Sequence, residues 1–261
     1  MATNRWTKEQ LKLGFHLYCQ LPFGKLHSRN PEIKRLAKLI GRTPGAVAMK
    51  LGNFASLDPA ILNRGLAGLG NAGSQDKEVW VEFHEDWEKL AVECELLRRK
   101  LDAEAIADDE AEEQLVPEDF TGETRKVVIE QRIKQTFFRK AVLSSYRGRC
   151  CMSGLSEPRL LIASHIVPWS KDRANRLNPS NGLCLSAIHD RAFDKGLITL
   201  SEDMRIVVST ELKRNKEDFV KDVLLPLDGQ PIELPERFAP QKEFIDWHRT
   251  IHFVDNRAKA S

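Results

Sequence analysis

Apolar residues recur at helical spacing through the first 54 residues of the chain. Three segments show this pattern, and each follows a residue type that favours the first position of a helix. These capping residues are Thr7, Asn30 and Thr43, and proline follows the second and third of them. Gly41 separates the second segment from the third. The pattern predicts three short helices joined by tight turns.

A longer apolar series lies between residues 80 and 101. Its members are spaced alternately three and four residues apart, which is typical of a helix with one apolar seam. They are Trp80, Phe83, Trp87, Leu90, Cys94, Leu97 and Leu101. The seam has two interpretations. It joins two copies of the chain into a homodimer, or its aromatic half covers the three-helix unit of its own chain.

The pattern changes in the second half of the chain. A helical series over 125–146 is followed by short apolar runs that read as strands, at 159–166, 182–185, 197–200 and 205–210. Ser186 caps a short helix between the second and third runs, and Gly196 ends that helix. We therefore expect an α+β protein in which a helical part precedes a hairpin and a short helix.

The net charge of +2 hides segments of strong and opposite charge. Residues 1–74 carry a balance of +8, residues 102–123 a balance of −10, and residues 124–261 about +7. Two basic regions on either side of an acidic strip favour contact with a polyanion. We expect a recognition or dimerisation domain over 1–101, an acidic linker over 102–123 and a second domain over 124–261.

The composition also excludes some classes of protein. No apolar run approaches the roughly 20 residues that span a bilayer, and the first residues have no apolar signal region. Five cysteines, an odd number without a framework spacing, fit a reducing compartment better than a disulfide scaffold. We therefore expect a cytoplasmic protein that makes no contact with membranes.

Three polar residues in the second half have the chemistry of a phosphodiester-cutting site. His165 ends an apolar run, Asn181 precedes Gly182, and His189 lies in the predicted short helix. Such a site needs a base for water, a group that holds the base in its working tautomer, and a ligand for a divalent ion. The three residues could supply these parts in that order.

The run from about 131 to 253 resembles the HNH endonucleases, the nuclease superfamily built on a ββα-metal finger. It is also similar to a subgroup of bacterial restriction endonucleases. The matching motifs are Arg132-x-x-Gln135-x-x-Phe138-Arg139, Cys150-x-x-Ser153-Gly154, Ser164-His165-Ile166-x-Pro168-Trp169, Asn181-Gly182-Leu183, His189-x4-Asp194-x-Gly196-Leu197-Ile198 and Trp247-His248-Arg249. The resemblance implies a metal-dependent DNA endonuclease with a role in restriction or phage defence, and it includes modification-dependent cleavage as one form of that role.

The resemblance also implies roles for single residues. His165 would be the general base, Asn181 would fix the loop that orients it, and His189 would bind a divalent metal ion with Asp194 as a candidate second ligand. Mg²⁺ and Mn²⁺ are the expected ions, with Ni²⁺ or Co²⁺ as alternatives. The chain departs from many relatives at Ser164, where they have a carboxylate or imidazole ligand.

Contacts with nucleic acid are expected from both domains. The two helices around Gly41 resemble a helix-turn-helix module, whose last helix would present Arg42 and Lys50 to DNA. Three further cations follow the candidate base in sequence and could grip the DNA backbone: Lys171, Arg173 and Arg176. Two alternatives to a DNA nuclease remain, a DNA-binding regulator with an inactive HNH finger and a nuclease that acts on RNA.

Overall fold

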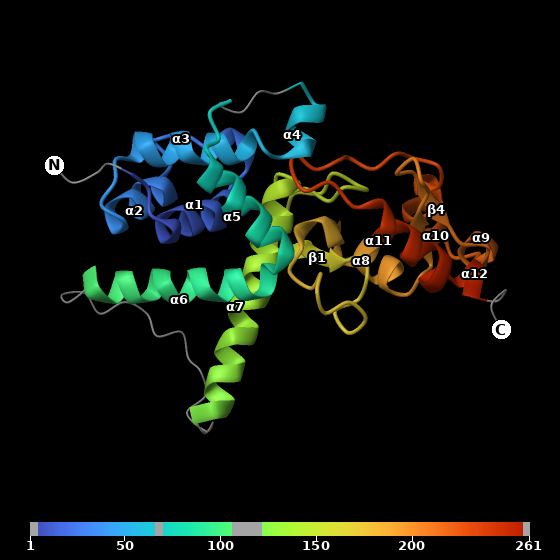
Figure 1. Ribbon diagram of the computed structural model, residues 1–261. Coiled ribbons are helices and arrows are strands. Elements are labelled where there is room, and N and C mark those ends of the chain that lie inside the picture. Colours follow the sequence, from blue (N-terminus) through green and yellow to red (C-terminus); the bar gives the residue numbers. More distant parts are fainter. Residues whose placement is uncertain (1–4, 66–69, 106–121, 258–261) are drawn as a thin grey trace. The chain divides into compact units, whose positions relative to one another are not determined.

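The computed structural model describes residues 5–65, 70–105 and 122–257, and the chain divides into two compact units, Met1–Ala141 and Val142–Ser261 (Figure 1). The division falls inside helix α7 (Gly122–Ser145), whereas the sequence places the start of the second domain at residue 124. Most of the expected acidic linker lies outside the described residues.

The first unit is helical, and its three predicted caps are confirmed. Thr7 and Gln10 close the capping box, Asn30 accepts a hydrogen bond from Glu32 N, and Thr43 accepts one from Ala46 N. The helices of this unit that precede α7 are α1 (Lys8–Gln20), α2 (Pro31–Leu39), α3 (Pro44–Ala55), α4 (Pro59–Asn63), α5 (Ser74–Glu85) and α6 (Trp87–Ala105), with a 3₁₀ turn at Phe23–Lys25.

The predicted continuous helix over 80–101 is wrong in one respect, because the chain breaks between α5 and α6 at Asp86. That residue leaves the helical region, and its carboxylate accepts a hydrogen bond from Lys89 N at 2.8 Å, as an N-cap does. The aromatic side chains of the seam pack inside the unit. The ring centroids of Trp80, Phe83 and Trp87 lie 5.2, 4.6 and 6.1 Å from that of Phe15 on α1.

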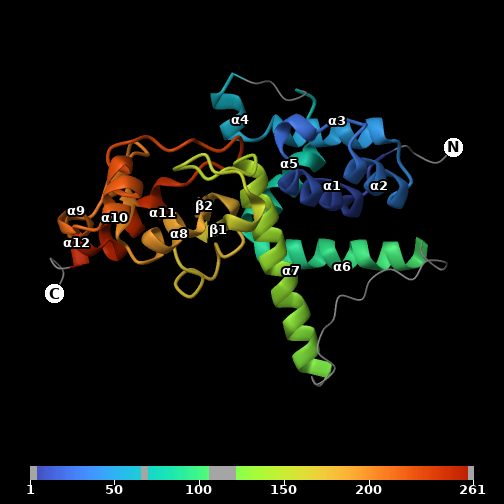
Figure 2. The same cartoon turned by 180° about the vertical axis from the view of Figure 1, so that it is seen from behind.

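The second unit contains the predicted hairpin and helix. Strand β1 (Leu161–His165) pairs antiparallel with β2 (Gly182–Ser186), and α8 (Ala187–Asp194) follows β2 directly and contacts both strands (Figure 2). In this register His165 lies opposite Gly182. The hairpin therefore brings the candidate base beside the residue that follows Asn181.

The remainder of the second unit supports α8. A second antiparallel pair joins β3 (Ile198–Leu200) to β4 (Ile206–Val208), and β3 contacts both α8 and a later π-helical turn over His248–His252. The other helices of this unit are α9 (Thr210–Arg214), α10 (Asp218–Val223), α11 (Lys242–Trp247) and α12 (Val254–Arg257), and 3₁₀ turns lie at Pro158–Leu160, Pro179–Asn181 and Leu225–Leu227.

Candidate active site

The geometry around His165 defines which of its ring nitrogens can act as a base. Its Nε2 lies 2.9 Å from the carbonyl oxygen of Arg176. A carbonyl only accepts hydrogen bonds, so Nε2 carries the proton and the neutral ring has Nδ1 as its basic nitrogen. Burial lowers the pKa of His165 below the ordinary value of 6.5, although the bond to Arg176 opposes this shift. The ring is therefore neutral near pH 7.

Asn181 is fully buried and uses its whole amide group. Its Oδ1 accepts a hydrogen bond from Val167 N at 2.8 Å, while its Nδ2 donates to the carbonyl oxygens of Val167 and Asn175 at 3.1 and 3.2 Å. Val167 follows the candidate base by two residues. The amide thus ties the segment after β1 to the start of β2, which limits where the imidazole of His165 can point.

The loop between the two strands is held by a ladder of short polar side chains at intervals of three. The Asp172 carboxylate accepts from the backbone and the side chain of Asn175, at 3.2 and 2.7 Å. Asn178 donates to Asn175 Oδ1 at 3.0 Å and caps the 3₁₀ turn through Ser180 N. Asn181 completes the series through its bond to Asn175. Asx side chains that bond to nearby backbone favour such turns over regular structure.

Trp169 and Arg176 form a second support for the base. The ring of Trp169 meets that of His165 edge to face at 5.6 Å between centroids. The Arg176 guanidinium lies 5.2 Å from the centroid of Trp169, and its Nε donates to the Trp169 carbonyl at 2.8 Å. Arg176, expected to contact nucleic acid, is thus engaged within the loop. Lys171 and Arg173 are exposed.

His189 is buried at the start of α8 and faces a cysteine. Its Nδ1 lies 3.3 Å from Sγ of Cys150, so a metal ion bound by this imidazole would have to use Nε2. Burial raises the pKa of the Cys150 thiol, but hydrogen bonds with His189 and Ser153 outweigh that effect and bring the pKa to about 6. Only one ring nitrogen of His189 remains for its predicted role as a metal ligand.

The next residue, Asp190, is a functional candidate that the sequence reasoning missed. Its half-buried carboxylate is hydrogen-bonded by Ser164 of β1. Burial raises the pKa of Asp190, while this hydrogen bond acts in the opposite direction. Ser164 occupies the position where many HNH relatives have a metal ligand, and the structure brings a carboxylate to it from the helix. The serine at position 164 was the signal in the sequence that a ligand, if needed, has to come from another element.

Asp194, the predicted second metal ligand, lies at the far end of α8. Its side chain is 51% exposed and has Arg191 and Lys195 as ion-pair partners, at 3.5 and 3.4 Å. Its carbonyl accepts a hydrogen bond from His252 Nε2 at 2.6 Å. These contacts are those of a helix terminus.

The Trp247-His248-Arg249 motif acquires a role in holding α8. His248 is buried, its ring stacks on Phe193 at 3.7 Å between centroids, and its Nε2 donates to the Phe193 carbonyl at 3.1 Å. Its Nδ1 is therefore the acceptor for the Thr199 hydroxyl, at 2.8 Å. Arg249 forms ion pairs with Glu202 and Asp246.

Arg42 and Lys50, the cations expected to read DNA, both have partners within the first unit. Arg42 donates to Gln10 Oε1, and Lys50 forms an ion pair with the buried carboxylate of Asp76 at 2.9 Å. Both also lie over the Trp6 ring, at 5.1 and 5.5 Å from its centroid. A contact with DNA would have to compete with these interactions.

Residues 150–201 match the family model for HNH endonuclease. The matched segment begins at Cys150, ends just after β3 and contains His165, Asn181 and His189. It supports nuclease activity on nucleic acid, a hydrolase reaction. No curated protein matches the chain.

The match extends over well under half of the chain, and the HNH domain is what it establishes. The α+β character of the chain, with the HNH domain in its C-terminal half, is confirmed. No helix among the described residues is both long and apolar enough to cross a bilayer.

HNH nucleases generally use divalent ions, so the donors near the base matter. Among the described residues no three His, Cys, Asp or Glu side chains cluster as a closed metal site. Asp190 with the Ser164 hydroxyl nevertheless offers oxygen donors. Mg²⁺ is commonly bound by one or two carboxylates, with water and substrate phosphate completing its shell. The donors present therefore fit an open site for a hard cation.

Proposed function

We propose that this protein is a metal-dependent DNA endonuclease in which His165 is the general base. The observation that supports this most directly is the bond from His165 Nε2 to the Arg176 carbonyl, which makes Nδ1 the nitrogen that takes a proton from water. Asn181 acts as a positioning residue through both atoms of its amide. A restriction or phage-defence role, with or without dependence on a modified base, belongs to the same proposal.

The divalent ion, when bound, would neutralise charge on the phosphate undergoing attack and on the departing oxygen. Asp190 is the residue best suited to hold it, and His189 Nε2 remains a second candidate. Mg²⁺ or Mn²⁺ suits the carboxylate, and Ni²⁺ or Co²⁺ would suit the imidazole. Lys171 and Arg173, exposed in the loop after His165, are available to contact the DNA backbone.

The direct test compares the wild-type chain with His165→Ala on supercoiled plasmid, with Mg²⁺ or Mn²⁺ and without either. We expect His165→Ala to lose roughly 10²- to 10⁴-fold in cleavage rate, the range for a general base, while its DNA affinity is unchanged. Arg205→Ala is a matched control, since Arg205 lies beyond β3 and bonds to Gly229. Undiminished cleavage by His165→Ala would remove the proposed base.

The same assay separates the substrates. Plasmids with unmodified, methylated or hydroxymethylated cytosine test dependence on base modification, and transfer RNA tests cleavage of RNA. Sequence-specific DNA binding without cleavage under any ion would instead favour a regulator with an inactive finger.

The metal assignment has its own test. Mn²⁺ binding, followed by electron paramagnetic resonance of the free ion, should weaken about tenfold or more in Asp190→Asn and much less in Asp194→Asn. This readout does not require catalysis. Equal weakening in both variants, or none in Asp190→Asn, would move the metal away from Asp190.

A further inference from the structure

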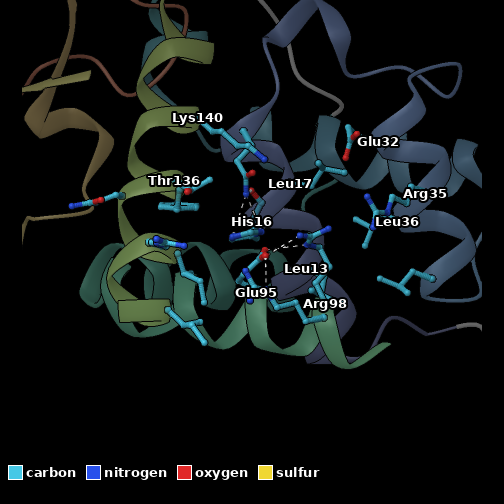
Figure 3. Close-up of a pocket in the computed structure, with 18 residues that line it drawn as sticks. Leu13, His16, Leu17, Glu32, Arg35, Leu36, Glu95, Arg98, Thr136 and Lys140 are labelled. Atoms are coloured by element: carbon cyan, nitrogen blue, oxygen red, sulfur yellow. Dashed lines mark hydrogen bonds and ion pairs between the residues drawn. The ribbon is translucent and has the colours of Figure 1, made fainter. Parts of the chain in front are cut away.

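The first unit contains a cavity of about 540 Å³ that the proposed nuclease chemistry does not use (Figure 3). Side chains from α1, α2, α6 and α7 line it. Pockets of about 300–1,000 Å³ are the usual size for small ligands. The cavity is therefore large enough for an organic molecule.

One wall of the cavity is uncharged. His16 is buried on α1, and its ring stacks on that of Phe137 on α7, with centroids 5.1 Å apart and planes 19° from parallel. Burial lowers the pKa of His16 to about 4, so the imidazole is neutral at physiological pH. The Gln20 amide lies against the same ring, 3.0 Å from Nδ1. This wall combines apolar surface with hydrogen-bonding groups, and little of the two stacked rings is exposed, 6% of His16 and 2% of Phe137.

The charge of the lining is predominantly positive. Five cationic side chains contribute to it, namely Arg35, Arg98, Arg99, Arg132 and Lys140, against the two carboxylates of Glu32 and Glu95. Glu95 is already neutralised by Arg98 and Arg99, at 2.8 and 3.2 Å. Arg35 also has a partner, Asp102, at 2.9 Å.

Two cations on α7 differ from the others. Arg132 and Lys140 line the cavity, yet neither has an ion-pair partner among the residues that the structure describes. Figure 3 shows Lys140 above the His16 ring, on the opposite side from Glu95 and Arg98. Two uncompensated cations at one cavity favour an anionic ligand, because they lose no existing ion pair when it binds.

We propose that this cavity binds a nucleotide. Arg132 and Lys140 would contact its phosphate, and the base would lie against the uncharged wall beside His16, among leucines such as Leu17 and Leu39. The ligand needs both a phosphate and a base because the lining has an uncharged wall and two cations that lack ion-pair partners among the described residues. The nucleotide would be either free in solution or part of a DNA strand, and the chemistry of recognition is the same for both.

The test uses the full chain in EDTA, so that no cleavage intervenes. Isothermal titration with the four 2′-deoxynucleoside 5′-monophosphates should show saturable binding, and deoxynucleosides and inorganic phosphate should each bind at least tenfold more weakly. The double variant Arg132→Gln/Lys140→Gln should lose tenfold or more in affinity. Lys34→Gln/Lys38→Gln is the matched control, because it removes two exposed charges from α2 that do not line the cavity.

A single-stranded oligonucleotide distinguishes the two sources. If the nucleotide belongs to a strand, monophosphate competes with the oligonucleotide and the α7 double variant weakens both. If it is free, only monophosphate binding depends on Arg132 and Lys140. The proposal is overturned if no monophosphate binds, if phosphate alone binds equally well, or if both double variants lose the same affinity. Because the readout is binding, its failure leaves the proposed nuclease activity untouched.

Discussion

Two regions, the surroundings of Phe15 in the first unit and those of the hairpin in the second, are organised by different kinds of interaction. Around Phe15 in the first unit, aromatic rings from α3, α5 and α6 pack with centroids 4.6–6.1 Å apart. Around the hairpin of the second unit, amide and imidazole groups make directed bonds to backbone, as Asn181 and His248 do. Apolar packing tolerates small displacements, whereas a hydrogen bond fixes direction as well as distance. Directed bonds of the second kind suit a group that needs a defined orientation, as the imidazole of His165 does.

The largest expected effect comes from the aromatic cluster. Phe15 is fully buried, so Phe15→Ala should lower the free energy of unfolding of the first unit by about 3–5 kcal/mol. Chemical denaturation followed by tryptophan fluorescence measures this change. Because the active-site bonds lie in the other unit, the cleavage rate per folded molecule should be unchanged. A large loss of rate in folded protein would contradict the separation of roles.

The next largest effect is a loss of stability of the first unit at acidic pH. The pKa of His16 is about 4 in the folded unit and near 6.5 when the chain unfolds, so the unfolded state binds more protons between these values. Stability is fully present above pH 6.5 and falls by roughly 3 kcal/mol as the pH drops towards 4. Thermal unfolding of the first unit across this range measures the slope.

Three charged side chains also act on the pKa of His16. Glu95 opposes the lowered pKa of His16, while Arg98 and Lys140 reinforce the larger effect of burial. The pKa of Glu95 is itself lowered by Arg98 and Arg99 despite its burial, so its contribution is lost only at more acidic pH. His16→Gln should therefore flatten the slope between pH 6.5 and 4. An unchanged slope would place the titrating group elsewhere.

A loss of stability together with a large loss of activity is expected at Asn181. Asn181→Ala leaves the backbone groups of Val167 without their partner, which costs about 1–3 kcal/mol per unsatisfied buried group. Since the loop that orients His165 loses its tie, cleavage should fall tenfold or more even in folded protein. Rate and unfolding free energy measured on the same sample test this. Loss of stability alone would show that Asn181 does not position the base.

Much of this arrangement follows from local sequence. The three caps, the hairpin and the start of α8 are set by residues within a few positions of each element, and they occur as predicted. The ladder in the loop was also readable, because Asp172, Asn175, Asn178 and Asn181 recur at every third position. Short-range chemistry of this kind does not depend on the rest of the fold.

Other features depend on residues that are distant in sequence. The partners of Arg42 and Lys50 are Gln10 and Asp76, so their engagement within the unit could not be read from α3 alone. The choice between His189 and Asp190 is similar, since neighbouring residues on a helix point about 100° apart. Which of them faces β1 is decided by how α8 packs on the hairpin. The break at Asp86 did have a local signal, because aspartate is a residue type that favours the position before a helix.

Two glycines of the second unit, one of them at the end of α8, differ in how closely other backbone approaches them. Gly196 and Gly229 both have positive φ, at 70° and 76°, so a side chain at either costs about 1 kcal/mol of backbone strain. At Gly196 a Cβ would also overlap the His252 carbonyl, whereas at Gly229 it would meet nothing within 4 Å. Gly196→Ala should therefore destabilise the second unit by about 2 kcal/mol or more, and Gly229→Ala by about 1 kcal/mol. Differential scanning calorimetry of both variants gives the difference. If the two lost equal stability, the close approach of the His252 segment to the end of α8 would not hold this helix in place.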